Sequence, residues 1–301
     1  MALPRAPERS PGNPPLELTS FIGREREVAV VEKLLAERRL LTLTGPGGCG
    51  KTRLALEVSR DLVGKFSDDV WVVELASLSD PDLVPQKVAF TLGVREQAGR
   101  RLTETLSSHL QPKEALLVLD NCEHLVVACA SLAEALLRAC PNLRILVTSR
   151  EALGITGETG WPVPSLSLPT SHHQPPVEEL LRYEAVRLFI ERAASVVPGF
   201  ELTEENAAAA AQVCRGLDGM PLAIELAAAR VKVLSVGQIA SRLDDRFRLL
   251  SAGSRTALPR HRTLRATIDW SHDLLSTEET VLFPRPGDVG WRRACPGPLP
   301  D

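Results

Sequence analysis

A glycine-rich octapeptide carries the clearest chemical signal in the sequence. Residues 45–52 read Gly-Pro-Gly-Gly-Cys-Gly-Lys-Thr, which matches the pattern G-x-x-x-x-G-K-[ST]. Glycines let the backbone curl so that successive N–H groups face phosphate oxygens, and a helix starting near Gly50 adds its positive end. In this pattern we expect Lys51 to reach the β- and γ-phosphates of a nucleotide and the Thr52 hydroxyl to bind Mg²⁺. The predicted nucleotide-binding residues here are Gly45, Pro46, Gly47, Gly48, Cys49, Gly50, Lys51, Thr52 and Arg53.

A second candidate site lies where an apolar run ends in an acid. Four apolar residues precede Asp120, as expected of a buried strand whose terminal carboxylate binds Mg²⁺, directly or through water. Many ATPases follow this aspartate with an acid, but here Asn121 follows, and a neutral amide cannot take a proton from the attacking water. Glu123 is the nearest carboxylate; it is the candidate base or, alternatively, a cap of the next helix. Slow or regulated hydrolysis is expected.

An arginine ends the next apolar run, at Thr148-Ser149-Arg150. The carboxyl end of a strand lies on the ligand side of an open parallel sheet, and a guanidinium pairs well with phosphate oxygens. We therefore predict that Arg150 senses the γ-phosphate, the alternative being a surface arginine in a salt bridge. The predicted catalytic residues are Lys51, Asp120, Glu123 and Arg150, and the predicted metal ligands are Thr52 and Asp120.

The elements that must position these residues alternate between strand and helix. Short, mostly apolar runs typical of buried parallel strands occupy 40–44, 70–75, 115–119 and 143–147. Apolar residues at helical spacing lie between them, in one case Leu54, Ala55, Val58 and Leu62, in another Leu125, Cys129, Leu132 and Leu136. This order predicts an α/β fold, a P-loop NTPase parallel sheet with helices on both faces. A phosphate loop between a strand and a helix disfavours the alternative of a glycine turn without a ligand.

A second, all-α unit is predicted after a proline-rich seam, Trp161–Pro176, whose composition is that of a linker. The strand signal then disappears. Leu181, Ala185, Leu188 and Phe189 form a helical stripe. Helix starts are expected at Thr203, followed by two glutamates, and at the capping boxes Ser235–Gln238 and Ser276–Glu279.

Composition excludes several classes of protein. The chain has 301 residues, enough for about two domains, with 24% charged residues and a net charge of −3. This balance gives no overall attraction to nucleic acid. No run of 18 uncharged apolar residues and no signal peptide is present, so a cytoplasmic protein without a membrane span is expected. The six cysteines form no C-x-x-C pair and no zinc spacing with histidine, so reduced thiols are expected.

Five motifs occur in order along the chain. They include Leu-Thr-Ser-Phe-Ile-Gly-Arg-Glu-Arg-Glu at 18–27, residues 116–124 and 148–153, and Gly-Met-Pro-Leu-Ala at 219–223. These motifs, and the stretches at 244–250 and 260–271, resemble those of STAND ATPases of the NB-ARC type, in the versions found in bacterial LuxR-type and antibiotic-regulatory (SARP-like) transcriptional regulators. The resemblance spans about residues 14–283. It implies that Gly23 and Arg24 line the base pocket and that Pro221 packs on adenine from the helical domain. By residue type alone, Arg24 could also be a phosphate or ribose contact, or only a surface charge. Pro221 also fits simple helix initiation.

The resemblance completes the predicted domain order. A disordered leader (1–17) precedes a nucleotide-binding domain (18–165), a linker (166–176) and a helical domain (177–253). An incomplete winged helix (254–283) and an aberrant proline-rich tail (284–301) follow. The family continues through a full winged helix where this chain has Pro284, so we expect a frameshift or a misplaced gene end.

The function that these residues predict is an ATP/ADP-binding switch with slow Mg²⁺-dependent ATP hydrolysis, in which the Trp161–Pro176 segment is the hinge region. Its partners would be the nucleotide and proteins, or further copies, bound through missing C-terminal domains, with no direct DNA binding and no membrane. The main alternative is a non-hydrolysing module that a nucleotide stabilises. A P-loop kinase would need an acceptor pocket and an arginine-rich lid that the sequence does not show, and no Asn-Lys-x-Asp motif indicates a GTPase.

Overall fold

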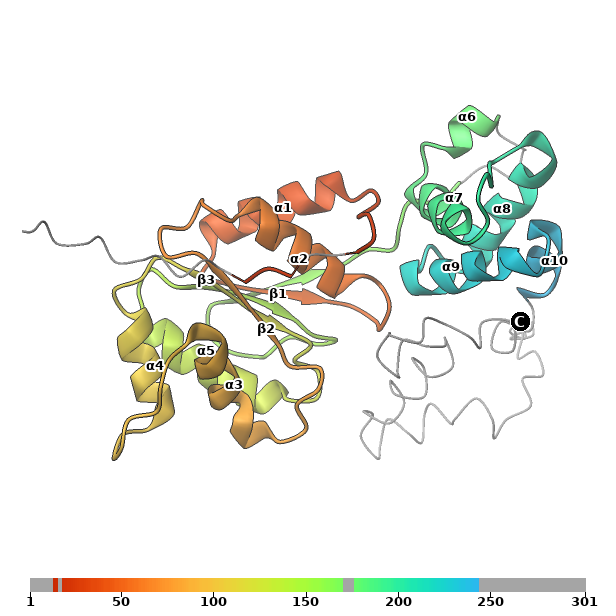
Figure 1. Ribbon diagram of the computed structural model, residues 1–301. Coiled ribbons are helices and arrows are strands. Elements are labelled where there is room, and N and C mark those ends of the chain that lie inside the picture. The colour runs from red at the N-terminus through yellow and green to blue at the C-terminus, as the bar shows by residue number, and fades with distance from the viewer. Residues whose placement is uncertain (1–12, 16–17, 170–175, 244–301) are drawn as a thin grey trace, which may run out of the picture.

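The protein folds into an α/β unit and a helical unit, which Figure 1 shows side by side. The computed structural model describes residues 13–15, 18–169 and 176–243. Several predicted features lie outside these residues: most of the leader, the 244–250 and 260–271 stretches, the Ser276–Glu279 box, the winged-helix start and the tail.

Five parallel strands form the sheet of the α/β unit, in the order β2-β3-β4-β1-β5. Their bounds are Leu40–Thr44 (β1), Val70–Glu74 (β2), Leu116–Asp120 (β3), Arg144–Thr148 (β4) and Glu158–Pro162 (β5). The four strands predicted from apolar runs are confirmed to within one residue at each end. The parallel pairing brings the carboxyl ends of β1, β3 and β4 to one edge, where the phosphate loop also lies.

The strand β5 corrects the predicted linker. Trp161 and Pro162, which composition assigns to the seam, pair with Leu43 and Thr44 of β1. β5 is an edge strand, where a proline without an N–H is tolerated, and its sequence Glu-Thr-Gly-Trp-Pro carries no apolar run. The chain after it is also engaged, because Val163 and Leu166 are buried, against the α/β unit and the helical unit respectively. The connection between the two units is thus shorter than the proline content suggests.

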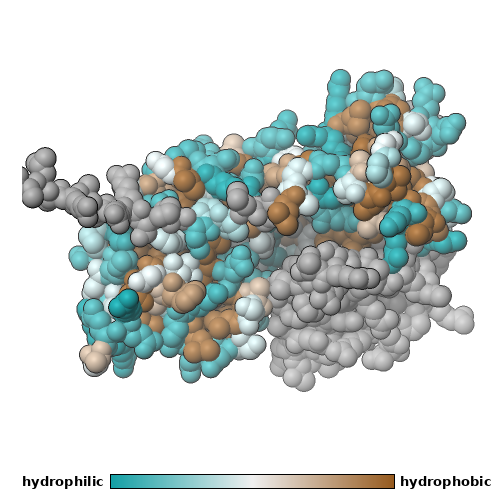
Figure 2. All heavy atoms as spheres, in the orientation of Figure 1, coloured by the Kyte–Doolittle hydropathy of each residue, from teal (hydrophilic) through white to brown (hydrophobic). Residues whose placement is uncertain are grey.

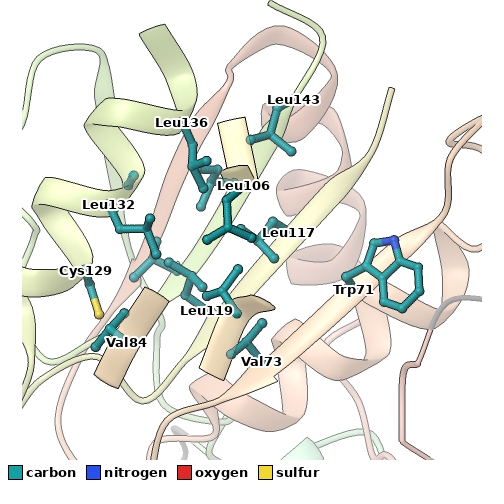
Figure 3. Close-up of a cluster of buried hydrophobic side chains, with 14 of the residues drawn as sticks. Trp71, Val73, Val84, Leu106, Leu117, Leu119, Cys129, Leu132, Leu136 and Leu143 are labelled. Carbon is teal, nitrogen blue, oxygen red and sulfur yellow. The ribbon is translucent and has the colours of Figure 1, made fainter. Parts of the chain in front are cut away.

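Helices cover both faces of the sheet, as predicted (Figure 1). On one face α1 (Glu25–Glu37) and α2 (Lys51–Asp61) pack on Leu41, Val72 and Val118. On the other, α3 (Val84–Leu92), α4 (Leu102–Leu110) and α5 (Val126–Ala139) pack on Leu117 and Ile145. Adjacent strand residues such as 117 and 118 serve opposite faces because side chains alternate along a strand. Figure 3 shows the second face, where Cys129, Leu132 and Leu136 of α5 lie over Leu117 and Leu119, as the helical spacing predicts.

The helical unit comprises α6 (Val177–Leu180), α7 (Glu184–Val196), α8 (Glu204–Gly216), α9 (Pro221–Ala228) and α10 (Val236–Ser241), with a short 3₁₀ turn at Ala229–Lys232. Thr203 and Ser235 are confirmed as N-caps with reciprocal side-chain bonds. Ala185, Leu188 and Phe189 are buried as the stripe predicts. Leu181 is an error in that prediction: it lies at the end of α6, before α7 begins, and is 42% exposed.

Hydrophobic and hydrophilic side chains are interspersed over both units in the space-filling view (Figure 2). Exposed large hydrophobic side chains include Phe90 on α3, Val127 on α5 and Val233 after the 3₁₀ turn. Single exposed hydrophobic residues of this kind are ordinary for a protein surface. Among the described residues, no helix has the length and hydrophobicity that crossing a bilayer requires.

Candidate functional site

The phosphate loop connects β1 to α2 and has the backbone conformation that its glycines permit. Gly45, Gly48 and Gly50 have φ values of 145°, 83° and 93°, which favour glycine. Lys51 is the first residue of α2, and its Nζ donates to the carbonyls of Gly45 at 2.8 Å and Pro46 at 3.1 Å. The ammonium group therefore lies across the mouth of the loop, within the space that phosphate oxygens occupy in a loop of this type.

Two threonine hydroxyls converge on the Asp120 carboxylate at the end of β3. Thr52 Oγ1 donates to Asp120 Oδ1 at 2.7 Å, and Thr148 Oγ1 donates to the same oxygen at 2.6 Å. Burial raises the pKa of Asp120; the bonds from Thr148 and Thr52 oppose this shift, and the charges of Glu123 and Glu74 add to it. A hydroxyl and a carboxylate are hard oxygen ligands of the kind that Mg²⁺ takes together with nucleotide phosphates.

Asn121 occupies the position of the missing acid, with a left-handed φ of 69°. Its backbone N–H donates to Thr148 Oγ1 at 2.8 Å. Its side-chain Nδ2 lies 3.3 Å from His124 Nδ1, while His124 Nε2 lies 2.7 Å from the carbonyl oxygen of Leu78. The carboxamide can thus orient a water by a hydrogen bond, but it cannot accept a proton.

Glu123 and Arg150 lie against each other, although the sequence assigns them separate roles. Arg150 Nε is 3.7 Å from Glu123 Oε1, and the Glu123 side chain is only 5% exposed. The contact matches the salt bridge that was the alternative for Arg150. The Glu123 carboxylate is thus held beside a guanidinium.

Arg24 lies behind the phosphate loop, at the N-cap of α1. Its Nη2 donates to the carbonyls of Cys49 at 2.6 Å and Pro164 at 2.9 Å, and its backbone N–H donates to Glu184 Oε1 at 2.6 Å. Burial lowers the pKa of Arg24, with the charges of Cys49, Glu27 and Glu184 opposing. Burial also acts to raise the pKa of Glu184, but its hydrogen bonds to Ser167 and Arg24 outweigh this and lower it. The preceding Gly23 has no room for a side chain, because a Cβ there would lie 2.6 Å from Glu184.

The helical unit touches the phosphate loop directly. Pro221 begins α9, as predicted, and the next backbone N–H, of Leu222, donates to the Gly48 carbonyl at 3.2 Å. Arg53, at the other end of the loop, donates to Thr19 and to the carbonyl of Ser20. Arg192 of α7 donates to the Ser20 carbonyl as well. The segment before α1 is therefore held by both units.

The structure brings together most of the residues that the sequence singles out. Lys51, Thr52 and Asp120 surround one site; Arg24 and Pro221 adjoin the loop from behind and from the helical unit. Three functional contacts could not be found from the sequence. Thr148 donates to Asp120, Glu184 accepts from the Arg24 backbone N–H, and Leu222 donates to the loop. Within the described residues, no three His, Cys, Asp or Glu side chains cluster as a metal site. A cation here would depend on Thr52, Asp120 and the nucleotide.

Comparisons with known proteins agree with this geometry. Residues 35–156 match the family model described as an AAA domain. Over 252 residues, the chain is 47% identical to "Putative HTH-type transcriptional regulator Rv0890c" of Mycobacterium tuberculosis, covering 84% of this chain and 27% of that protein. Over 268 residues, it is 43% identical to the uncharacterized protein Rv0894 of the same organism, covering 89% of this chain and 65% of that protein. This chain thus spans only about a quarter of the first relative's length.

Two solved structures resemble the fold at low identity. One is a STAND protein with a tetratricopeptide repeat sensor from Pyrococcus horikoshii, with a TM-score of 0.47 at 16% identity, covering 92% of this chain and 36% of that one. The other is the ORC2 protein of Aeropyrum pernix, with a TM-score of 0.49 at 14% identity, covering 76% and 70%. The sheet order, the phosphate loop and the family match together identify the α/β unit as a P-loop ATPase domain of the AAA type.

Proposed function

We propose that this chain is the nucleotide-binding unit of a longer bacterial regulator, an ATP/ADP switch with slow Mg²⁺-dependent hydrolysis, of the NB-ARC type seen in LuxR-type and SARP-like regulators. The observation that carries the proposal is the bond from Leu222 N–H to the Gly48 carbonyl. It joins the phosphate loop to the helical unit, so a change in the loop on nucleotide binding bears on that unit's position. The name of the 47% identical relative supports a role in transcriptional control.

The residues present fit a nucleotide and Mg²⁺. Lys51 supplies a positive charge to the β- and γ-phosphates, Thr52 and Asp120 supply oxygen ligands to the cation, and α2 directs its positive end at the loop. When bound, Mg²⁺ would neutralise phosphate charge. Gly23 and Arg24 adjoin the loop, and Pro221 would face the base. Arg150 would reach the γ-phosphate by leaving Glu123.

Asn121 favours a second candidate, the non-hydrolysing module. A carboxamide beside Asp120 cannot act as a base, and Glu123 is engaged by Arg150. In that case the bound nucleotide stabilises the contact between the two units, and the state of the module changes only when one nucleotide is exchanged for another. Phosphate release separates the two candidates: turnover with Mg²⁺ and no added partner supports the switch that hydrolyses.

Calorimetric titration of ADP and ATP tests the site itself. In Lys51→Ala we expect affinity to fall by about 100-fold, because a charge-assisted contact with phosphate contributes roughly 3 kcal/mol. Lys33→Ala is the control, since Lys33 is an exposed lysine on α1. Unchanged affinity in Lys51→Ala would refute the assignment of this loop as the nucleotide site.

A further inference from the structure

We propose that Arg24 is a positioning residue that orients the phosphate loop from behind, through a backbone carbonyl. The resemblance implies instead that this residue lines the base pocket. The inference rests on the proposed function, because it concerns the same nucleotide site. It assigns to Arg24 a part in binding the phosphates that needs no contact with the base.

The geometry of one peptide group carries the inference. In a trans peptide the C=O and N–H bonds point in opposite directions, and the described residues contain no cis peptide. Arg24 Nη2 lies 2.6 Å from the Cys49 carbonyl oxygen. Holding that oxygen toward Arg24 turns the N–H of Gly50, the other end of the same peptide, away from Arg24 and toward the opposite side of the loop. Backbone N–H groups so directed are what bind phosphate in a glycine-rich loop.

The preceding peptide group shows the same arrangement. The Gly48 carbonyl accepts from Leu222 N–H at 3.2 Å, on the outer side of the loop. The N–H of Cys49, at the other end of that peptide, faces the Pro46 carbonyl at 3.4 Å. Pro46 also accepts from Lys51 Nζ, so this N–H points to the side where the ammonium group lies. Two successive carbonyls thus point outward to fixed donors, and their N–H groups are turned inward.

The backbone conformation and the burial of Arg24 both cost free energy. It has a left-handed φ of 66° and is 3% exposed, and a buried cation is costly unless it is well paired. Glu184 Oε1, from the helical unit, fixes its backbone N–H, and the planar guanidinium bridges Cys49 to Pro164. A strained, buried, charged residue is retained where neighbouring groups determine its position, and such residues cluster at functional sites.

The other terminal nitrogen of the guanidinium, Nη1, suggests a competing role for Arg24. Arg24 Nη1 is buried with no hydrogen-bond acceptor among the described residues, and a Cβ on Gly50 would lie 3.5 Å from it. Direct donation from Nη1 to a phosphate oxygen would give Arg24 a different role. The experiment therefore has to report on the loop backbone separately from ligand affinity.

The sequence offers a specific probe of this backbone. Cys49–Gly50 is the only Cys-Gly pair in the chain, so protein labelled with ¹³C-carbonyl cysteine and ¹⁵N-glycine gives one HNCO signal, the Gly50 amide. We would compare the full chain with Arg24→Lys and Arg24→Met, without ligand and with ADP or tripolyphosphate. Arg26→Met is the matched control, since Arg26 is the exposed arginine two residues along.

We expect the Gly50 amide signal to move in both Arg24 variants without ligand, and to stay in place in Arg26→Met. Affinity for ADP and for tripolyphosphate should fall by the same factor, about 10- to 100-fold in Arg24→Met and less in Arg24→Lys, as for loss of a charge-assisted hydrogen bond. If Arg24→Met does not fold, Arg24→Lys alone decides the question.

Three results would overturn the inference. An unmoved Gly50 signal with weaker tripolyphosphate binding would mean direct phosphate contact through Nη1. Loss of ADP affinity with unchanged tripolyphosphate affinity would return Arg24 to the base pocket. Unchanged affinity for both ligands would leave Arg24 with no part in binding. If the unmodified chain binds neither ligand, the proposed function fails. The Gly50 signal without ligand still reports whether Arg24 orients the loop, so the two failures can be told apart.

Discussion

The two halves of the site differ in how completely they are built. On the loop side, the carbonyls of Gly48 and Cys49 have fixed donors, Lys51 lies across the loop, and Arg24 is held by Glu184. At the carboxyl ends of β3 and β4, Asp120 is held by two hydroxyls, but the next position is the neutral Asn121. The first half has the geometry of a phosphate-binding loop. In the second, a neutral amide follows the aspartate where many ATPases have an acid.

This difference is the basis of the proposed switch. A loop whose N–H groups are oriented in advance binds its ligand without a further ordering cost. A site that holds a nucleotide well and hydrolyses it slowly stays in one state long enough for other parts of a protein to respond. The helical unit is well placed to respond, because Leu222 and Glu184 contact the loop and Arg24 from that unit.

The largest expected effect comes from supplying the missing base. In Asn121→Asp we expect ATP hydrolysis to rise by about 100-fold, in the range general-base catalysis contributes, while ADP affinity stays near that of the unmodified chain. Aspartate suits the site because, like asparagine, it tolerates a left-handed φ such as the 69° observed. Phosphate release under single-turnover conditions measures the rate.

Glu123→Gln is the companion variant for this prediction. Because Glu123 is paired with Arg150, we expect its loss to change the slow basal hydrolysis by less than about 3-fold, well below a general-base contribution. If Asn121→Asp is no faster, and Glu123→Gln abolishes turnover, then Glu123 is the base and the two halves of the site are equally complete.

Local patterns made the loop side predictable. The glycines, Lys51 and Thr52 are adjacent in sequence, and Asp120 is marked by the apolar strand before it, so short segments sufficed to predict them. The same holds for strands β1 to β4 and the two N-caps of the helical unit. In each case the physical cause of the structure lies within a few residues of its effect.

Contacts between distant segments were not predictable in this way. Arg24 and Glu184 are 160 residues apart, and Arg24 and Pro164 are 140 apart; one sequence contains no pattern that pairs them. Edge strand β5 has no buried residue and therefore no apolar run, so its pairing with β1 leaves no apolar pattern in the sequence. A loop carbonyl that accepts from Leu222 N–H likewise leaves no side-chain signature, because both partners are backbone groups.

A smaller effect should follow from crowding the contact between loop and helical unit. In Gly48→Ala a Cβ would lie 2.9 Å from Leu222 Cβ, so α9 or the loop must shift. We expect ADP affinity to fall by about 10-fold, because an oriented hydrogen bond contributes about 1 kcal/mol or more, in addition to a loss of stability from the left-handed φ of 83°. Calorimetry and thermal melting separate the two effects.

Gly64→Ala is the matched control for the backbone strain that an alanine suffers at a left-handed φ. Gly64 has nearly the same φ, 80°, with no atom within 4 Å of an added Cβ. It should lose stability by a similar amount, about 1–2 kcal/mol for a left-handed residue, and keep its ADP affinity. Equal affinity losses in the two variants would show that the Leu222 contact does not influence the loop.

The smallest effect concerns Asp120, the proposed cation ligand of the hydrolytic half. Since burial raises the pKa of Asp120 above its ordinary value of 3.8, the folded chain favours the protonated carboxyl. That contribution to stability is present below the ordinary pKa and is lost as the pH rises through the raised one. Without ligand, Asp120→Asn should therefore melt a few degrees higher than the unmodified chain at pH 7.5, and the difference should shrink as the pH falls toward the ordinary pKa of 3.8.

With Mg²⁺ and ATP the difference in melting temperature should reverse in sign, so that Asp120→Asn melts lower than the unmodified chain. The variant lacks a carboxylate ligand and therefore gains less stability from binding. Thermal melting with and without Mg²⁺-ATP measures both differences. A group that lowers the stability of the ligand-free fold at neutral pH, and raises it only when a cation is bound, is one that the fold keeps for its ligand. If Asp120→Asn melts lower than the unmodified chain at every pH without ligand, the bonds from Thr52 and Thr148 outweigh desolvation. Asp120 would then be a structural residue, and the hydrolytic half would retain no group kept for binding a cation.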